Sequence, residues 1–210
     1  MQNETGLITV LSGFSGAGKG TIMKHLLQEY PDKYHLSISA TTRKPRTGEE
    51  DGREYFFKTK AEFERMIKDN EFLEYAQFND NYYGTPKKYV EDLANSGHDV
   101  ILEIEMQGAL NVRKVFPEAL LLFVTPPDAV SLKNRLVGRG TESPEEIGNR
   151  LAISDQESFY MEQYDYLIVN DDLETAVKSV HDIIECEHLR VSRSMGFVKK
   201  MQNDLSIYKK

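Results

Sequence analysis

Apolar runs and amphipathic stretches alternate along the chain, and this pattern predicts strands and helices in turn. The helix after the first run carries its apolar side chains on one face, and Pro31 marks its end. Because strands that alternate with helices favour a parallel sheet with helices on both faces, we expect an α/β fold. The predicted core strands are Leu7–Ser12, Val100–Glu105, Leu120–Thr125 and Tyr166–Val169, and the apolar helix face holds Ile22, Met23, Leu26, Leu27 and Tyr30.

Local capping patterns predict where further helices begin. A hydroxyl residue followed three positions later by glutamate is a capping box, and proline is favoured at the first helical position. Two capping boxes are found, at Thr59–Glu62 and at Ser143–Glu146, the second with Pro144 at the first helical position. Thr85–Pro86 matches an N-cap followed by proline. Two further helices are expected, over Ala129–Val137 and after Asp172.

Two segments depart from the strand–helix alternation. Between about Ser37 and Tyr83, Arg, Gly, Tyr and Phe dominate, with short strand-like pieces and one helix, so we expect an inserted lobe. From Val191 onward the chain is basic and polar, which fits either a frayed helix or a mobile tail.

A glycine-rich turn joins the first strand to the first helix. Gly13-Phe14-Ser15-Gly16-Ala17-Gly18-Lys19 matches G-x-x-x-x-G-K in the strand–turn–helix context that this motif requires. Its glycines let successive N–H groups face one anion, the helix N-terminus adds a positive dipole end, and Lys19 reaches the outer phosphates. Gly20 stands where a Mg²⁺-binding Ser or Thr is usual. Either Thr21 reaches the ion, or phosphates and water hold it.

The composition is that of an ordinary globular domain, with 210 residues, 40% hydrophobic and 29% charged. The net charge of −8 argues against non-specific binding to nucleic acid or membrane surfaces. The longest apolar run, Ala119–Val124, is too short to cross a bilayer, and the N-terminus lacks a signal-peptide pattern. The single cysteine, Cys186, cannot form an internal disulfide, so we expect a cytoplasmic protein with Cys186 buried in a helix.

Basic and acidic side chains recur at positions suited to phosphate chemistry. Arg43 and Arg46 flank Pro45, and their guanidinium forks match phosphate geometry. Glu103 and Glu105 point to one face near the carboxyl end of a predicted strand, where open α/β sheets place ligands.

A second set of arginines lies later in the chain. Arg135 and Arg139 share a helical face, and Arg150 lies on the next helix. Taken singly, such arginines more often belong to a solvated basic face, and Asn170, after the fourth strand, could simply cap a helix.

Together these motifs resemble the guanylate kinase family over about Leu7 to Glu187. The resemblance rests on the glycine-rich loop, S-x-T-T-R-x-P-R-x-G-E from Ser39, F-L-E from Phe72, Y-Y-G-T from Tyr82 and an E-x-Q-G strand end from Glu105. It implies a P-loop NTPase fold with a three-layer α/β/α core (residues 6–36, 86–127 and 165–190), a GMP-binding lobe (37–85), a lid (128–164) and a tail (191–210).

The resemblance also implies a reaction, Mg·ATP + GMP giving ADP and GDP, within purine metabolism and GMP recycling, with dGMP as a further expected substrate. Its site residues fall into four groups. ATP is assigned to Gly13 to Thr21 and Asn170. The GMP phosphate is assigned to Arg43, Arg46, Tyr55 and Tyr83, guanine to Ser39, Glu74 and Thr85, and the GMP side also to Glu103. Mg²⁺ is assigned to Thr21 and, through water, to Glu105, and catalysis to Lys19, Arg135, Arg139 and Arg150.

The chemistry of guanine supports the assignment of Glu74. Guanine presents two adjacent donors, N1–H and the 2-amino group, and one carboxylate can accept both, while Thr85 can donate to O6. Adenine would leave a buried carboxylate poorly paired, which discriminates strongly.

Three other functions stay open at this point. They are a catalytically inactive binding module of the same fold, a kinase for another monophosphate, and a GTP-hydrolysing switch, although the N-K-x-D motif of such switches is absent from the sequence. A homo-oligomer is possible on the sequence alone.

Overall fold

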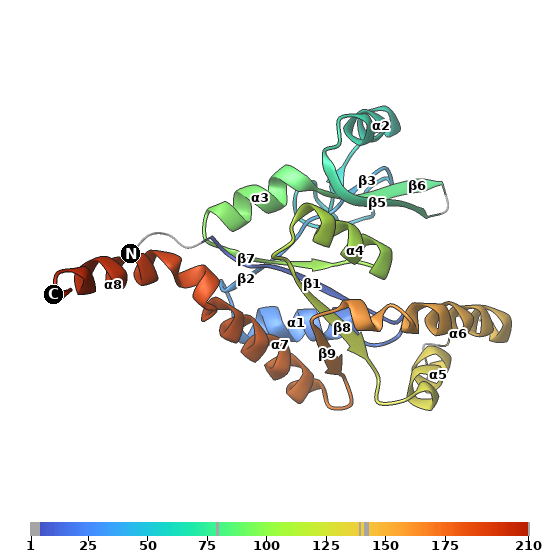
Figure 1. The fold of residues 1–210 in the computed structure, drawn as a ribbon. Coiled ribbons are helices and arrows are strands. Elements are labelled where there is room, and N and C mark those ends of the chain that lie inside the picture. Colours follow the sequence, from blue (N-terminus) through green and yellow to red (C-terminus); the bar gives the residue numbers. More distant parts are fainter. Residues whose placement is uncertain (1–4, 79, 139, 141–142, 210) are drawn as a thin grey trace.

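The computed structural model describes all residues except 1–4, 79, 139, 141–142 and 210. Its centre is a five-stranded parallel sheet with the strand order β2-β7-β1-β8-β9 (Figure 1). The strands are β1 (Ile8–Gly13), β2 (Tyr34–Leu36), β7 (Asp99–Glu103), β8 (Leu120–Thr125) and β9 (Tyr166–Val169). The parallel sheet that the sequence pattern predicts is therefore confirmed.

Helices cover both faces of this sheet, because successive strand side chains point to opposite sides. Val10 packs in one apolar cluster with the first pair of helices, whereas Leu11 packs in a second cluster with the other pair. The first pair is α3 (Lys87–Asn95) and α4 (Met106–Val115), and the second is α1 (Lys19–Glu29) and α7 (Leu173–His188). The three layers place the carboxyl ends of β1, β7 and β8 at one edge.

A second, four-stranded sheet forms the inserted lobe, in the order β4-β3-β6-β5. Its buried anchor is Phe63, whose ring stacks on those of Phe72 and Tyr82, with centroids 4.3 and 5.3 Å away. The capping box of Thr59 and Glu62 is confirmed at the start of the lobe helix. The lobe comprises β3 (Ala40–Thr41), β4 (Phe56–Phe57), α2 (Lys60–Lys68), β5 (Phe72–Phe78) and β6 (Asn81–Pro86).

Two helices, α5 (Ala129–Gly138) and α6 (Pro144–Ser158), follow β8 and lie on the same side of the core as the lobe (Figure 1). The capping box at Ser143 is confirmed, with Pro144 at the helix start. Short 3₁₀ turns follow at Met161–Gln163 (η1) and Val191–Ser194 (η2).

Two expectations about local structure are wrong. Thr85 is not an N-cap: it pairs with Glu74 as part of β6, and α3 begins only at Lys87, because Pro86 is extended (φ −65°, ψ 121°). Cys186 is exposed on α7 rather than buried.

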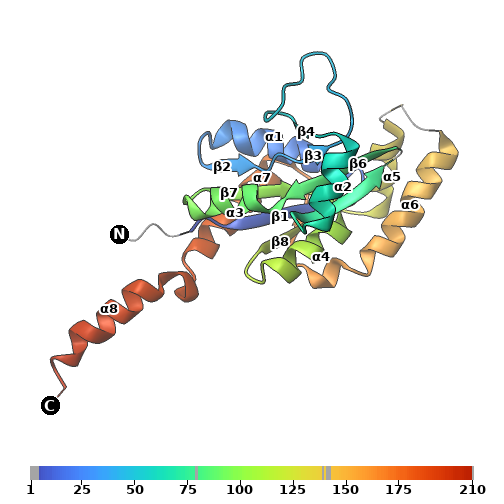
Figure 2. The ribbon, with the colours of Figure 1, turned by 90° about the horizontal axis from the view of Figure 1, so that it is seen from above.

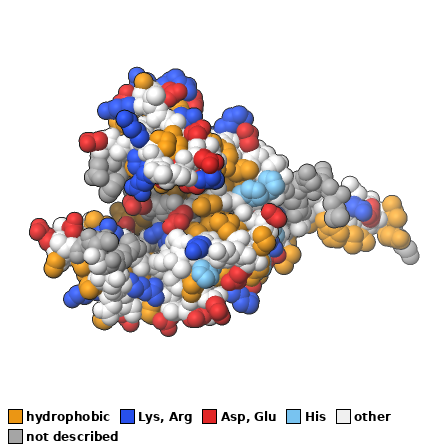
Figure 3. Space-filling model, turned by 180° about the vertical axis from the view of Figure 1, so that it is seen from behind, with side chains coloured by type: hydrophobic (Ala, Val, Ile, Leu, Met, Phe, Trp, Pro, Cys, Tyr) orange, Lys and Arg blue, Asp and Glu red, His pale blue; other side chains and the backbone are white. Residues whose placement is uncertain are grey.

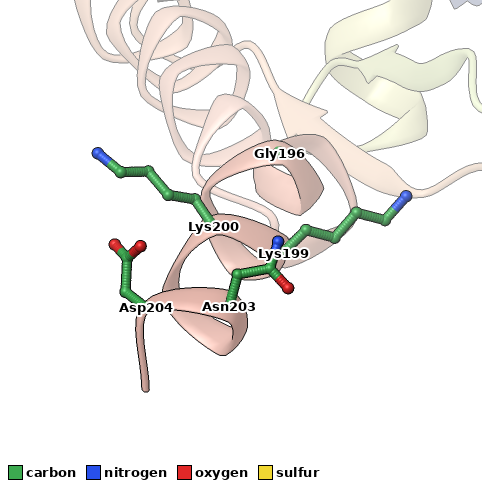
Figure 4. A pocket seen from close by; sticks show the side chains of 5 residues that line it. All are labelled: Gly196, Lys199, Lys200, Asn203 and Asp204. Atoms are coloured by element: carbon green, nitrogen blue, oxygen red, sulfur yellow. The ribbon is translucent and has the colours of Figure 1, made fainter. Parts of the chain in front are cut away.

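The C-terminal segment forms a helix, α8 (Met195–Ser206), which projects from the body of the molecule (Figure 2). Figure 4 shows its polar side, with Lys199, Lys200, Asn203 and Asp204 pointing outward. Among the described residues, no helix combines the length and apolar character that crossing a membrane requires.

Candidate phosphoryl-transfer site

The glycine-rich loop between β1 and α1 has a backbone that only glycine adopts readily. Gly13, Gly16 and Gly18 have φ angles of 142°, 94° and 96°. A Cβ at Gly13 would lie 2.0 Å from the carbonyl oxygen of Val124, so β8 leaves no space for a side chain. Because α1 begins at Lys19, the positive end of its helix dipole lies at this loop, where an anion is stabilised.

Lys19 and Glu103 line one cavity of about 310 Å³ beside this loop, together with Thr21. The Lys19 ammonium donates to the carbonyl oxygens of Gly13 (2.7 Å) and Phe14 (3.1 Å). Burial raises the pKa of Glu103, and the charge of Lys19 acts in the opposite direction. The cavity is therefore lined by one cation and one carboxylate beside the glycine-rich backbone.

Gly20 lies beside this carboxylate. A Cβ at Gly20 would make ordinary van der Waals contact with Oε1 of Glu103, at 3.5 Å. Carboxylate, hydroxyl, phosphate and water oxygens are the ligands that Mg²⁺ prefers, and Glu103 and Thr21 supply the first two. In the described part of the chain, no group of three or more His, Cys, Asp or Glu could hold a metal.

Asn170 and Arg135 fasten the loop to the rest of the core. The buried Asn170 amide donates to the carbonyl oxygen of Ala17 (2.8 Å). Arg135 donates to the same oxygen through Nη1 (3.3 Å) and to the Asn170 carbonyl through Nη2 (2.6 Å). The helix cap after β9 is Asp172, so Asn170 supports the loop instead of capping a helix.

A second arginine reaches the loop from α6. Nη1 of Arg150 donates to Oγ of Ser15 at 2.6 Å. Arg135 and Arg150 therefore both lie at the loop, one on α5 and the other on α6, whereas Arg139 lies outside the described residues. Polar contacts thus connect both helices to the glycine-rich loop.

Across the molecule, the lobe presents a half-buried acidic side chain. Glu74 lies on β5 opposite Thr85 on β6, and the Thr85 hydroxyl donates to Oε1 of Glu74 at 2.6 Å. A Cβ at Gly108, in the first turn of α4, would lie 3.2 Å from Oε2 of Glu74. Burial raises the pKa of Glu74, the bonds from Thr85 lower it, and the nearby Glu105 raises it further.

The predicted anion clamp lies on the loop between β3 and β4. Arg43 forms a two-pronged ion pair with Glu49, with both N–O distances at 2.9 Å, and its guanidinium lies 5.3 Å from the centre of the Tyr55 ring. The rings of Tyr55 and Tyr83 are 6.1 Å apart in an edge-to-face arrangement. The structure thus brings together Arg43, Tyr55 and Tyr83.

Two other members of the predicted lobe set lie at the margins of this group. The Arg46 side chain is exposed, while its backbone N–H donates to Oε2 of Glu49 at 2.7 Å. Ser39 precedes β3 and accepts a bond from the Phe56 N–H (2.9 Å) through its carbonyl, which leaves its half-buried hydroxyl for other partners.

The two strand-end glutamates lie in different surroundings. Glu103 lines the cavity beside the glycine-rich loop, whereas Glu105 is close enough to Glu74 and Glu157 to raise the pKa of both. Glu105 lies beyond the end of β7, as the N-cap residue of α4, so the two side chains do not share one face of a strand as the sequence pattern predicts.

Three side chains or positions that the sequence did not single out also contribute. Glu157, on α6, has a pKa raised by burial and by Glu105 and lowered by Lys19, so it lies near the centre of the site. Gly108 is the last residue of the E-x-Q-G pattern, which was the available signal for it. Glu49 is likewise the last residue of the T-T-R-x-P-R-x-G-E pattern.

From behind, the space-filling view shows a hollow between the lobe and the rest of the molecule (Figure 3).

Comparison with known proteins gives a consistent picture. The family model described as guanylate kinase matches residues 6–187. The chain is similar to a solved structure, the guanylate kinase from Anaplasma phagocytophilum, with 30% identity, a TM-score of 0.70 and 90% of each chain covered. The chain is more weakly similar to shikimate kinase from Bacteroides thetaiotaomicron. The identity is 15% and the TM-score 0.47, with 85% of this chain and 98% of the other covered.

Proposed function

Because this chain belongs to the guanylate kinase family of nucleoside-monophosphate kinases, we propose that it transfers the γ-phosphoryl group of ATP to GMP, and to dGMP, giving ADP and the diphosphate. The observation that carries the choice of guanine is the half-buried Glu74, with the buried Thr85 beside it, in the lobe. A carboxylate that has lost much of its solvation needs donors, and guanine supplies two adjacent ones.

Guanine recognition follows from the charge of Glu74. The ionised carboxylate accepts N1–H and the 2-amino group, the Thr85 hydroxyl exchanges its bond to Glu74 for one to O6, and the Ser39 hydroxyl completes the base pocket. Because the raised pKa of Glu74 reflects lost solvation, two donors from guanine restore what burial removed. Adenine offers an acceptor at the same edge, so AMP would leave the carboxylate unpaired.

The phosphate of GMP is held by the aromatic and basic group on the lobe. Arg43 keeps a fixed orientation through Glu49 and Tyr55, so it presents its remaining donors without a large entropic cost. Tyr83 donates from the adjacent strand, and the exposed Arg46 swings in from the same loop. Fixed cations of this kind position one substrate for in-line transfer.

ATP binds on the other side, with its phosphates in the Gly13–Lys19 loop. Lys19 exchanges its two carbonyl partners for phosphate oxygens, and Arg135 and Arg150 do the same from the lid. Mg²⁺, bound by phosphate oxygens and water near Glu103 and Thr21, would neutralise charge on the transferring group. We assign Glu103 to this side and Glu105 to the GMP side, because of where each carboxylate lies.

The transfer itself needs no protein base. A phosphate monoester has a second pKa near about 6, so GMP already carries a dianionic oxygen at neutral pH. In the loose transition state, negative charge spreads over the equatorial oxygens, and Lys19, Arg135, Arg139 and Arg150 stabilise it. Closure of lobe and lid would exclude water and limit wasteful hydrolysis of ATP.

A steady-state assay with ATP and Mg²⁺ across GMP, dGMP, AMP, CMP and UMP tests this proposal. We expect kcat/KM for GMP and dGMP to exceed that for AMP by at least about a thousandfold, because of the unpaired carboxylate. Turnover of AMP at a similar rate would contradict guanine selection, and no turnover with any monophosphate would favour a binding module.

A further inference from the structure

Position 20 lacks the side chain with which loops of the G-x-x-x-x-G-K-[ST] type hold Mg²⁺. In such loops the hydroxyl that follows the lysine binds the ion. This chain has Gly20 there, as the second residue of α1, and glycine offers no side-chain ligand. Backbone conformation does not require the glycine, because Gly20 has no left-handed φ, unlike three other glycines of the loop. Either the ion has one protein ligand fewer, or another side chain supplies it.

A carboxylate lies beside the position of the missing hydroxyl. A Cβ at Gly20 would lie 3.5 Å from Oε1 and 3.8 Å from Oε2 of Glu103. Apart from the two chain neighbours of Gly20, no other described side chain comes within 4 Å of that point. Both distances are ordinary van der Waals contacts, so a serine would fit there, and crowding does not require the glycine either.

The strand order brings Glu103 to this point. β7 pairs with β1 in parallel, with Glu103 opposite Leu11, so β7 ends beside the strand that runs into the glycine-rich loop. Glu103 therefore lines the same cavity as Lys19 and Thr21. The residue is exposed, so its carboxylate is open to a ligand that enters this cavity.

The negative charge of Glu103 conflicts with phosphate binding unless a cation lies between the two. Phosphates in the loop bring further negative charges close to this carboxylate, and like charges at short distance repel. Lys19 contributes one positive charge to the cavity, which does not balance both a carboxylate and a chain of phosphates. A divalent ion with a preference for oxygen ligands removes the conflict.

We propose that Glu103 supplies the protein ligand for the Mg²⁺ of Mg·ATP that position 20 does not provide. The usual hydroxyl of the loop is then replaced by an anionic ligand from the neighbouring strand. This inference rests on the proposed use of ATP, but it does not depend on which monophosphate accepts the phosphoryl group. The competing protein ligand is Thr21, whose side chain lines the same cavity.

The first test compares ADP binding in Mg²⁺ and in EDTA, by isothermal titration calorimetry. Glu103→Gln should have opposite effects in the two conditions. In EDTA the ADP affinity should rise by about twofold or more, because a negative charge beside the phosphates is gone. In Mg²⁺ it should fall by about tenfold or more, because the ion loses an anionic ligand. A damaged loop would weaken binding in both conditions, so the change of sign excludes a merely structural effect.

The metal can also be followed directly. Electron paramagnetic resonance of Mn²⁺ measures the free ion, and the affinity of Mn²⁺ for the protein–ADP complex should fall in Glu103→Gln as the calorimetric difference predicts, because the coupling between two ligands is reciprocal. Glu29→Gln, an exposed carboxylate at the far end of α1, is the matched control and should bind ADP and Mn²⁺ as the wild type does.

The second test restores the missing hydroxyl. In the Glu103→Gln background, Gly20→Ser should recover most of the lost Mg²⁺ dependence of ADP binding, because the hydroxyl returns to its usual place in the motif. Gly20→Ala in the same background adds the Cβ without the oxygen and should recover none of it. The two double variants differ by a single oxygen atom, so a difference in metal binding between them does not come from packing of the Cβ.

Three results would overturn the proposal. Glu103→Gln could change ADP affinity by the same factor in Mg²⁺ and in EDTA, or not at all. The two double variants at Gly20 could bind the metal equally. Thr21→Val could abolish the Mg²⁺ dependence while Glu103→Gln retains it.

These measurements contain no GMP, so their outcome is separate from that of the proposed function. A chain that binds Mg·ADP through Glu103 but does not phosphorylate GMP would contradict the proposed function alone. Normal turnover of GMP together with unaltered metal binding in Glu103→Gln would contradict this inference alone.

Discussion

The hydroxyl of Thr85 donates to Oε1 of Glu74 at 2.6 Å, across neighbouring strands of the lobe. The two residues are directly opposite each other in the β5–β6 register, just after a register shift between Phe72 and Glu74. This contact fixes one carboxylate oxygen and leaves the other on the side of Gly108. The lobe thus holds a half-buried acid in a set orientation before any nucleotide arrives.

Replacing Thr85 by valine should weaken GMP binding by at least about tenfold, because guanine O6 then loses its donor in a site closed to water. The affinity for ATP should stay the same, since Thr85 lies in the other half of the site. Isothermal titration calorimetry measures both affinities. Thr47→Val, at an exposed position of the same lobe, is the control. Equal loss of both nucleotides would indicate that the lobe has simply unfolded.

The pKa of Glu74 predicts a dependence on pH. Burial raises this pKa above its value in the unfolded chain, so the contribution of Glu74 to folding stability falls as the pH rises from the unfolded to the folded pKa. Guanine needs the ionised form, so affinity should rise over the same window. Guanosine, which has no phosphate to titrate, is the probe to use. A pH profile that is identical in wild type and Glu74→Gln would contradict this assignment.

Gly18 tests the construction of the phosphate loop. Its φ of 96° suits glycine alone, and a Cβ would lie 2.5 Å from Nδ2 of Asn170, the group that donates to Ala17. We expect Gly18→Ala to cost about 1–3 kcal/mol in the free energy of unfolding and most of the ATP affinity. Gly138→Ala is the matched control, because a Cβ there meets open space among the described residues. Similar denaturation midpoints for both variants would argue against the strain.

Replacing Lys19 should affect turnover and the binding of GMP differently. Lys19→Ala should lower kcat by at least about a hundredfold while GMP still binds, because the lysine lies at the phosphate loop and not in the lobe. Lys24→Ala, an exposed position on the same helix, should keep its turnover. Normal turnover in the first variant would refute the role of Lys19.

Sequence periodicity was sufficient for the parts of the fold that repeat a regular pattern. Four of the five core strands, the glycine loop and both capping boxes are found where the pattern places them, within a residue or two. β2 escaped prediction because three residues are too few to show an alternation. Thr85 escaped because its side chain serves Glu74 across the sheet, a tertiary contact that outweighs a local capping preference.

The site, too, could be predicted only in part. The motifs that resemble the family predict Lys19, Glu74 and Arg43 as site residues, but they do not predict the hydrogen-bond partners that these side chains have in the structure. The contacts of Arg135 and Arg150 with the loop join residues more than a hundred positions apart, so no local pattern contains them. The separation of Glu103 from Glu105 depends on the residue at which β7 ends, which is the least certain feature of any sequence-based assignment.

The central claim is that Glu74 selects guanine, and the affinities of the Glu74→Gln variant for GMP and ATP test it most directly. Glutamine presents an N–H donor where guanine also donates, so calorimetry should show GMP binding weakened by about a hundredfold or more and ATP binding unchanged. Glu64→Gln, on the exposed face of α2, should bind both nucleotides normally. Unchanged GMP affinity in Glu74→Gln, or an equal loss of GMP and ATP, would contradict the account.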